Sequence, residues 1–176
     1  AAIVQPRAAD HVAQRPDVGD RQLVLRQLLP DRVQVLVLHV RQQDVLLVDG
    51  EEVTGAKQNR VMNASVFVEA GKVLNVPVSC TERGRWRYRS QKFVDPDVLM
   101  CADIRQTKSE SVSNSLKMKK GYASNQGKVW KDIGSVHACM EVSSPTDAMQ
   151  DAYEAKQNDL QAFKDAFAPE DRQTGV

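Results

Sequence analysis

Strand-like patterns come first in this chain and helix-like patterns follow, and this order is what most constrains the fold. Short apolar runs with period-two alternation extend from about residue 33 to residue 80. Beyond Asp95, apolar residues recur at intervals of three and four, the spacing of amphipathic helices. Strands that precede helices indicate an α+β fold. We therefore predict an antiparallel, sandwich-like β part over residues 33–90 and packed helices over residues 97–168.

The strand patterns predict two hairpins. Val33–Val40 and Val45–Val48 are apolar runs separated by a short polar turn. Ser65–Val68 and Val73–Cys80 flank a glycine turn and predict the second hairpin. In the longer strand, Pro77 lacks an N–H group, so we expect an edge strand or a bulge there.

Three helical stretches follow the predicted strands. The first covers Val98–Thr107, and residues 108–122 are polar and Ser-rich, which predicts a mobile segment. The second begins at a cap on Ser124 or Asn125 and extends to Met140. The third has Ser144 as its cap and continues until Pro169. We assign its apolar stripe to core packing; the stripe consists of Met149, Ala152, Tyr153, Leu160, Phe163 and Phe167.

Length and charge bound the class of protein. The 176 residues predict a single domain, with a β core over residues 46–93 and a helical part over residues 97–168. The formal net charge of +1 provides no overall field for nucleic acid or a membrane surface. No apolar run approaches the roughly 18 residues of a membrane helix, and no signal peptide pattern is visible. We expect a soluble, cytoplasmic protein without a membrane partner.

The first 45 residues have an unusual composition. They contain no Lys, Glu, Ser, Thr, Asn, Met, Cys or aromatic residue. Nearly every residue type present can be encoded by a codon that begins with G or C, a bias that out-of-frame reading of GC-rich DNA produces. Two interpretations stay open: a biased but authentic β and turn region, or a partly mistranslated stretch.

Alternating arginines follow the second predicted hairpin. As a strand, the GRWRYRS segment would place Arg83, Arg85, Arg87 and Arg89 on one face, with Trp86 and Tyr88 on the other. Residues on one face of a strand recur about every 6.6 Å. A phosphate or diphosphate spans that distance, and guanidinium groups bind such oxygens in pairs. The alternative is a half-buried strand with solvated arginines.

A polar segment before the hairpin carries further candidate ligand contacts. Lys57 and Arg60 provide positive charge, while Gln58 and Asn59 provide amide donors and acceptors. Because no Ser or Thr follows the lysine, this segment is not a Walker-type phosphate loop. A polar surface loop explains the same residues.

Other chemically capable residues favour structural roles. Of Glu51 and Glu52, only one side chain can join a site, and a salt bridge to Lys57 or an arginine is the expected role. The three cysteines are too widely spaced for a zinc site and are expected to be buried thiols. His137 lies on a helical stripe and is expected to be structural, and no nucleophile–histidine–carboxylate set can be assembled. We predict no metal site and identify no cofactor.

Residues 49–90 resemble a known family. The GEEVTGAKQNR and SCTERGRWRYRS motifs are similar to the ARG- and rhodanese/phosphatase-associated protein domain, a bacterial and archaeal family of undefined function. The resemblance covers roughly residues 45–176 and continues through NQGKVW and SPTDAMQDAYE. It implies a link to ADP-ribose or NAD-derived metabolites. It also implies that the chain stops inside a longer domain, so that we expect the completing strands to be missing or supplied by a partner and the site to be incomplete.

These observations predict a protein that binds a phosphorylated, nucleotide-like small molecule. The alternative is a non-enzymatic interaction or oligomerisation module that uses a sheet edge, and single-stranded nucleic acid binding is a weaker third hypothesis. Whether the protein is an enzyme stays open. The candidate ligand-binding residues are Glu51, Lys57, Gln58, Asn59, Arg60, Glu82, Arg85, Trp86 and Arg87.

Overall fold

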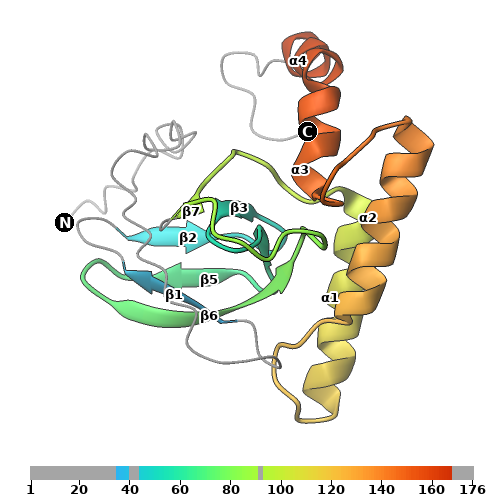
Figure 1. Ribbon diagram of the computed structural model, residues 1–176. Helices are drawn as coiled ribbons and strands as arrows, with labels where there is room; N and C mark the ends of the chain where they lie inside the picture. Colours follow the sequence, from blue (N-terminus) through green and yellow to red (C-terminus); the bar gives the residue numbers. More distant parts are fainter. Residues whose placement is uncertain (1–34, 40–43, 91–92, 168–176) are drawn as a thin grey trace, which may run out of the picture.

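The computed structural model describes residues 35–39, 44–90 and 93–167, with only the backbone described for residues 35–39. Seven strands precede four helices within these residues, which confirms the predicted α+β class (Figure 1). The expectations about residues 1–34, including His11, lie outside the described residues. The strands are β1 (Val35–His39), β2 (Val45–Leu47), β3 (Glu52–Gly55), β4 (Arg60–Met62), β5 (Val66–Val68), β6 (Val73–Cys80) and β7 (Phe93–Val94).

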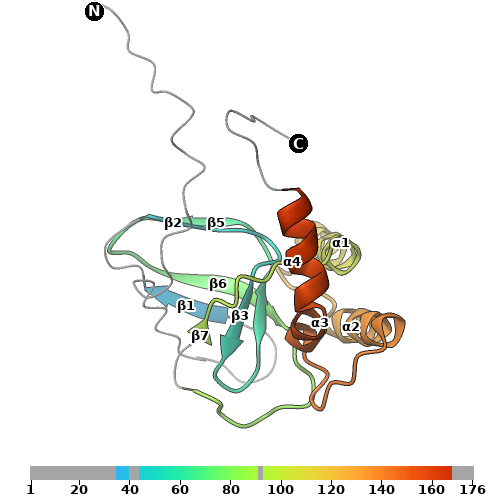
Figure 2. The same cartoon turned by 90° about the horizontal axis from the view of Figure 1, so that it is seen from above.

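The strands form two antiparallel sheets. Five of them follow the order β1–β6–β4–β3–β7, and β2 pairs with β5 in a second sheet. Figure 2 shows the β2–β5 pair lying over β6 and β1, with α1 and α2 together at one side of the sheets. The helices are α1 (Ala102–Lys117), α2 (Gln126–Met140), α3 (Met149–Ala155) and α4 (Gln157–Ala166).

Two apolar clusters lie on opposite faces of β4. Met62 belongs to a cluster between the two sheets, together with Leu47, Val53, Val68, Val76 and Val78. Val61 belongs to a cluster against the helices, together with Met100, Ile104, Val129, Ile133 and Met149. Because neighbouring residues on a strand point to opposite faces, β4 is buried on both sides and ties the two clusters together.

The strand positions agree with the sequence pattern, but both predicted hairpins are wrong. β1 pairs with β6, and β2 pairs with β5, so neither predicted hairpin forms. The turn at Gly71 does form, with a 3.1 Å hydrogen bond from the Lys72 N–H to the Glu69 carbonyl. The chain there crosses from one sheet to the other, and this places apolar side chains of both sheets in one cluster.

Pro77 does not mark an edge strand. β6 lies between β1 and β4, pairing with β1 through Pro77 and with β4 from Val78 onward. Pro77 therefore sits where β6 changes its partner. The missing N–H group falls at the end of one ladder and before the next, a position that a proline can occupy in an interior strand.

The first helix is longer than predicted. α1 continues to Lys117, beyond the predicted helical stretch and into the segment that was predicted to be mobile. Lys108 and Val112 are buried in this stretch. The Lys108 ammonium group pairs with the Asp49 carboxylate and donates a 2.8 Å hydrogen bond to the Met62 carbonyl. The polar composition of this stretch does not predict a packed helix, because the side chain that anchors it is a lysine.

The second helix matches its prediction. Asn125 caps α2 by accepting a 3.1 Å hydrogen bond from the Lys128 N–H group. Val129, Ile133 and His137 form the buried stripe, whereas Met140, at the end of the same predicted stripe, is exposed. The helix ends at Glu141, which adopts a left-handed conformation with φ 54°.

The third predicted helix is two helices. Asp147 has φ 52°, so α3 begins only at Met149, and Ser144 instead accepts a hydrogen bond from the Ala148 N–H. The helix breaks at Lys156, where φ is −109°. No residue of α4 is buried. The predicted core role is therefore wrong for the α4 part of the stripe, since Phe163 and Phe167 are 64% and 79% exposed.

Candidate functional site

A tight polar turn joins β3 to β4 and starts the candidate site. Ala56 is in the left-handed region with φ 44°, and it follows Gly55 with φ 130°. The Asn59 Oδ1 atom accepts a 3.2 Å hydrogen bond from the Gly55 N–H and so closes the turn. The structure resolves the polar segment of Lys57, Gln58, Asn59 and Arg60 into this turn and the start of β4.

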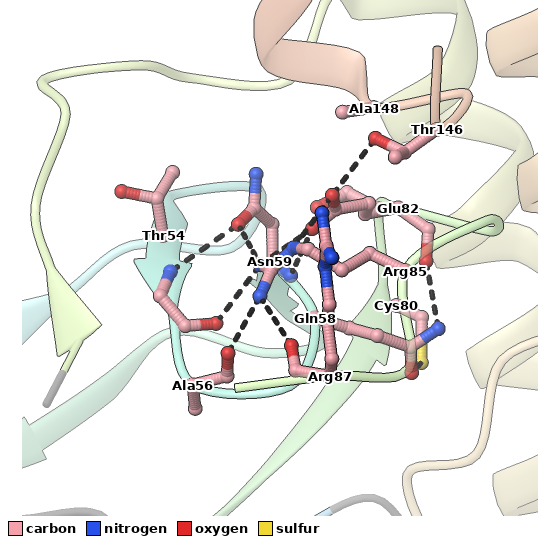
Figure 3. A network of polar contacts seen from close by, with 12 residues as sticks. Thr54, Ala56, Gln58, Asn59, Cys80, Glu82, Arg85, Arg87, Thr146 and Ala148 are labelled. Carbon is pink, nitrogen blue, oxygen red and sulfur yellow. Dashed lines mark hydrogen bonds and ion pairs between the residues drawn. The ribbon is translucent and has the colours of Figure 1, made fainter. Parts of the chain in front are cut away.

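Arg85 clamps this turn to the loop that follows β6. Its Nη1 atom donates to the carbonyls of Ala56 and Arg87 at 2.6 and 3.1 Å. Its Nη2 atom donates to the Gly55 carbonyl and to Asn59 Oδ1, both at 3.2 Å (Figure 3). Every nitrogen of the guanidinium therefore faces an acceptor inside the protein, once the contacts to Glu82 are added. Arg85 holds two backbone segments together and has no donor left for a phosphate.

Glu82 is the counter-charge of this clamp. Its carboxylate accepts from Arg85 Nε at 2.8 Å and from Thr146 Oγ1 at 2.8 Å, and Arg85 Nη2 lies 2.7 Å from Oε2. The Asn59 N–H donates to the same carboxylate at 3.2 Å. Burial works against the charged form, but these hydrogen bonds outweigh it and lower the pKa of Glu82 below 4.5. Glu82 is therefore an ionised anchor.

Gln58 links the clamp to Arg60 and Cys80. Its Nε2 atom donates to the Glu82 carbonyl at 2.8 Å, and its Oε1 atom accepts from Arg60 Nη1 at 3.2 Å. Arg60 Nη1 also donates to the Cys80 sulfur at 2.7 Å. Gln58 and Asn59 are both buried and committed to these contacts. In the structure both side chains support the turn, and a contact of either with a ligand stays a prediction.

The segment after Glu82 is an irregular loop and not the predicted strand. Its arginines therefore do not share one face: Arg85 points inward, whereas Arg83, Arg87 and Arg89 are exposed. Trp86 and Tyr88 are 67% and 64% exposed, and the Lys57 ammonium lies 5.2 Å from the Tyr88 ring centroid. We call this surface the cationic–aromatic loop; it consists of Lys57, Arg83, Trp86, Arg87, Tyr88 and Arg89.

The loop is docked against the segment that precedes α3. The Gly84 N–H donates a 2.8 Å hydrogen bond to the Thr146 carbonyl, and Glu82 forms a β-bridge with Ala148. A Cβ atom on Gly84 would lie 3.0 Å from the Thr146 Cα atom. Glycine is needed here because two backbones approach closely.

Glu52 is an enclosed carboxyl group beside this network. Its Oε1 atom accepts a 2.5 Å hydrogen bond from the Thr81 hydroxyl, and Oε2 has no partner among the described residues. Burial raises the pKa of Glu52 to about 8, and the Thr81 hydrogen bond opposes this rise. Glu52 itself forms no salt bridge with Lys57 or an arginine among the described residues, since burial favours a neutral acid.

The structure brings most predicted residues into one region but divides their roles. Gln58, Asn59, Arg60, Glu82 and Arg85 are inside, and Lys57, Trp86 and Arg87 lie on the surface loop. Glu51 does not lie at the turn, because it precedes β3 and its backbone pairs with Met62.

Sequence reasoning missed two contributors to the network. Thr146 binds Glu82 across the fold, and no local pattern announces a contact between residues 64 apart in the chain. Thr81 directly follows Cys80 in the sequence, and no motif identifies it as part of a polar network. The three-residue spacing of Glu82 and Arg85 is visible in the sequence, but it indicates an ion pair only where the chain forms a turn-like loop.

The thiols and the histidine divide between core and surface. Cys80 is buried, but Cys101 is partly exposed and Cys139 is exposed, so the prediction of three buried thiols holds only for the first. His137 is buried on the α2 stripe.

Among residues 44–90 and 93–167, no group of three or more His, Cys, Asp or Glu could hold a metal ion. None of the described helices has both the length and the apolar content needed to cross a membrane.

Together, fold and site define an α+β protein in which a buried arginine–glutamate clamp fixes a tight turn and an exposed cationic–aromatic loop. The chain matches the ARG and Rhodanese-Phosphatase-superfamily-associated Protein domain over residues 31–176. It therefore belongs to this family. No curated protein and no solved structure matches it significantly.

Proposed function

We propose that this protein binds a phosphorylated, nucleotide-like small molecule of the ADP-ribose or NAD kind on the cationic–aromatic loop. The observation that carries the proposal is the exposure of Trp86 and Tyr88 among basic side chains on a backbone that Arg85 holds. Large aromatic side chains exposed on a surface are candidates for ligand contact, since burial elsewhere would stabilise the fold. A nucleotide offers both an aromatic base and phosphate oxygens.

The aromatic side chains suit the base. Trp86 and Tyr88 are both about two-thirds exposed. Stacking of a base on such a ring contributes about 1–3 kcal/mol in single-stranded nucleic acid complexes. Lys57 already lies over the Tyr88 ring, so we assign the base to Trp86.

The basic side chains suit the phosphates. Arg87 lies next to Trp86 and is exposed, and its carbonyl is fixed by Arg85. The Lys57 ammonium group lies over the ring of Tyr88, which belongs to the same surface loop. Guanidinium groups bind phosphate oxygens in pairs, and lysine adds a point charge. We therefore assign Arg87 and Lys57 to the phosphates in place of Arg85.

A calorimetric titration tests the proposal. ADP-ribose, NAD, nucleoside phosphates and sugar phosphates are titrated into the wild type and into the double variant Trp86→Ala Arg87→Gln. We expect saturable binding of at least one nucleotide and at least a tenfold weaker Kd in the double variant. The matched control is Arg105→Gln, which removes a partly exposed arginine from α1. Equal binding by the double variant and the wild type would refute the proposed site.

A second candidate function is a protein interaction or oligomerisation module. Leu46 and Phe67 face each other across the β2–β5 pair and are 58% and 59% exposed. An apolar cross-strand pair on an outward sheet face is typical of a contact surface. Light scattering of the wild type and of Phe67→Ser separates the two candidates. A dimer that Phe67→Ser dissociates would favour the module, and a monomer at all concentrations would weigh against self-association.

A further inference from the structure

Arg60 is a buried arginine that has no carboxylate ion-pair partner of its own in the described part of the chain. Three basic side chains are buried among the described residues: Arg60, Arg85 and Lys108. Arg85 pairs with Glu82, and Lys108 pairs with Asp49. Arg60 is 7% exposed and forms no ion pair with a carboxylate among the residues that the structure describes. Removing a guanidinium from water without a counter-charge is unfavourable, so a buried arginine of this kind is a candidate anion site.

Glu82, the carboxylate of the same network, is already committed. Both of its oxygen atoms accept hydrogen bonds, from Arg85, Thr146 and the Asn59 N–H. Glu82 also compensates the Arg85 charge. The network as a whole therefore carries two guanidinium groups and one ionised carboxylate, before any contribution from the Cys80 thiol.

All hydrogen bonds of Arg60 use one nitrogen. Nη1 donates to Gln58 Oε1 at 3.2 Å, to the Asn59 carbonyl at 3.4 Å and to the Cys80 sulfur at 2.7 Å. Within the described part of the chain, Nε and Nη2 have no hydrogen-bond partner. Arg60 keeps 7% of its surface exposed, and neither nitrogen is among the fully enclosed side-chain atoms that lack a partner.

The unused nitrogens form the edge that binds oxyanions best. Nε–H and one Nη2–H lie side by side on the guanidinium plane and point in the same direction. Such a pair matches two oxygen atoms of a phosphate or carboxylate with two parallel hydrogen bonds. The contacts at Nη1 fix the plane from the opposite side, which lowers the entropy that binding would cost.

Arg60 also has a defined place in the sheet. It pairs with Val53 on β3 and with Cys80 on β6, so the three side chains form a row on one face. Gln58 connects Arg60 to the Glu82 backbone, which leads into the cationic–aromatic loop.

We propose that the Nε–Nη2 edge of Arg60 is an anion subsite that receives one phosphate group of the ligand. This inference rests on the proposed function above and deepens it. Gln58 and Cys80 position the guanidinium, and Arg87 and Lys57 would contact the remaining charge of the ligand at the surface.

The direct test uses the unaltered protein and inorganic phosphate. The ¹⁵N-resolved Nε–H resonance of Arg60 is followed while phosphate replaces chloride at constant ionic strength. We expect a saturable shift of this resonance and none for Arg105, which is partly exposed on α1. An unchanged Arg60 resonance, or a shift that chloride reproduces, overturns the subsite.

A variant supplies the second measurement. Arg60→Lys keeps the positive charge but removes the paired N–H edge, so we expect phosphate affinity to fall at least tenfold. Arg105→Lys is the matched control and should bind phosphate as the wild type does. If Arg60→Lys does not fold, the resonance of the unaltered protein still decides.

Two further outcomes separate this inference from its foundation. Nucleotide binding that is equal in the wild type and Arg60→Lys would overturn the subsite and leave the proposed function standing. Phosphate binding at Arg60 without binding of any nucleotide would support the subsite and contradict the proposed function. A thiolate absorbance near neutral pH that Cys80→Ser abolishes, combined with indifference to phosphate, would identify Cys80 as the counter-ion and overturn the subsite.

Discussion

At the scale of single residues, burial decides which charged groups are available for chemistry. Arg85 and Glu82 neutralise each other and hold the backbone, whereas Arg83 and Arg87 remain on the surface. Glu52 is buried and pairs with no basic group among the described residues, and burial raises its pKa to about 8. The same residue type thus has opposite pKa shifts at Glu52 and Glu82, because only Glu82 receives charged hydrogen bonds.

The raised pKa of Glu52 predicts a pH-dependent stability. The folded protein keeps the Glu52 proton up to about pH 8, whereas the unfolded chain releases it near 4.5. The folded state therefore binds more protons between these values, so stability from this group is complete below 4.5 and declines until about 8. The slope approaches about 1.4 kcal/mol per pH unit. Urea unfolding of wild type and Glu52→Gln between pH 4 and pH 9 measures it, and the variant should lose most of this slope. An identical slope in both proteins would show that Glu52 ionises normally.

Removing the clamp is predicted to destabilise the fold. Arg85→Ala leaves the Glu82 carboxylate buried without its partner, which costs about 3–5 kcal/mol. Arg83→Ala, two residues away and exposed, should change the free energy of unfolding by less than about 0.5 kcal/mol. Urea unfolding of both variants measures the difference. Similar losses in the two variants would contradict the assignment of Arg85 to the clamp.

At the scale of elements, the long-range partners of each segment decide its structure. α2 was predictable because its cap and its buried stripe are both local features of the sequence. β4 was not predictable, because its three residues are all buried and follow directly on a polar turn, so they show no alternation. The arginine-rich segment has a strand-like alternation, but Arg85 turns it inward toward the Ala56 carbonyl. Contacts between distant segments leave no periodic signal, so the sequence pattern does not reveal them.

Two glycines give matched predictions at this scale. Gly84→Ala would place a Cβ 3.0 Å from the Thr146 Cα atom and should cost about 1–2 kcal/mol. Gly134→Ala meets nothing within 4 Å in the middle of α2 and should stabilise the protein by about 0.5–1 kcal/mol. Thermal unfolding of both variants checks the opposite signs. A stabilising Gly84→Ala would mean that the loop is not held against Thr146.

The helices predict a second contrast. Ile133 on α2 is 1% exposed, so Ile133→Ala should cost about 2–5 kcal/mol of stability. Phe163→Ala on α4 should cost less than about 1 kcal/mol, because the side chain is 64% exposed. Chemical denaturation compares the two variants. A large loss for Phe163→Ala would reveal that α4 packs against something in solution.

At the scale of the whole molecule, β4 and the β3–β4 turn connect the two apolar clusters to the cationic–aromatic loop. β4 carries Val61 against the helices and Met62 between the sheets, and Arg60 begins it beside Cys80. The Ala56 carbonyl of the turn accepts from Arg85 and thereby fixes the cationic–aromatic loop. The α+β class was readable from the order of patterns, but sheet order was not, because β6 exchanges partners midway.

A backbone amide spectrum of the protein, titrated with ADP-ribose and then with other nucleotides, tests whether the cationic–aromatic loop binds a ligand. We expect saturable shifts of the amides in residues 56–60 and 83–90, with α4 and the β2–β5 pair unchanged. Shifts confined to α4 or to the β2–β5 pair, or no shift with any nucleotide, would contradict a ligand site on the cationic–aromatic loop.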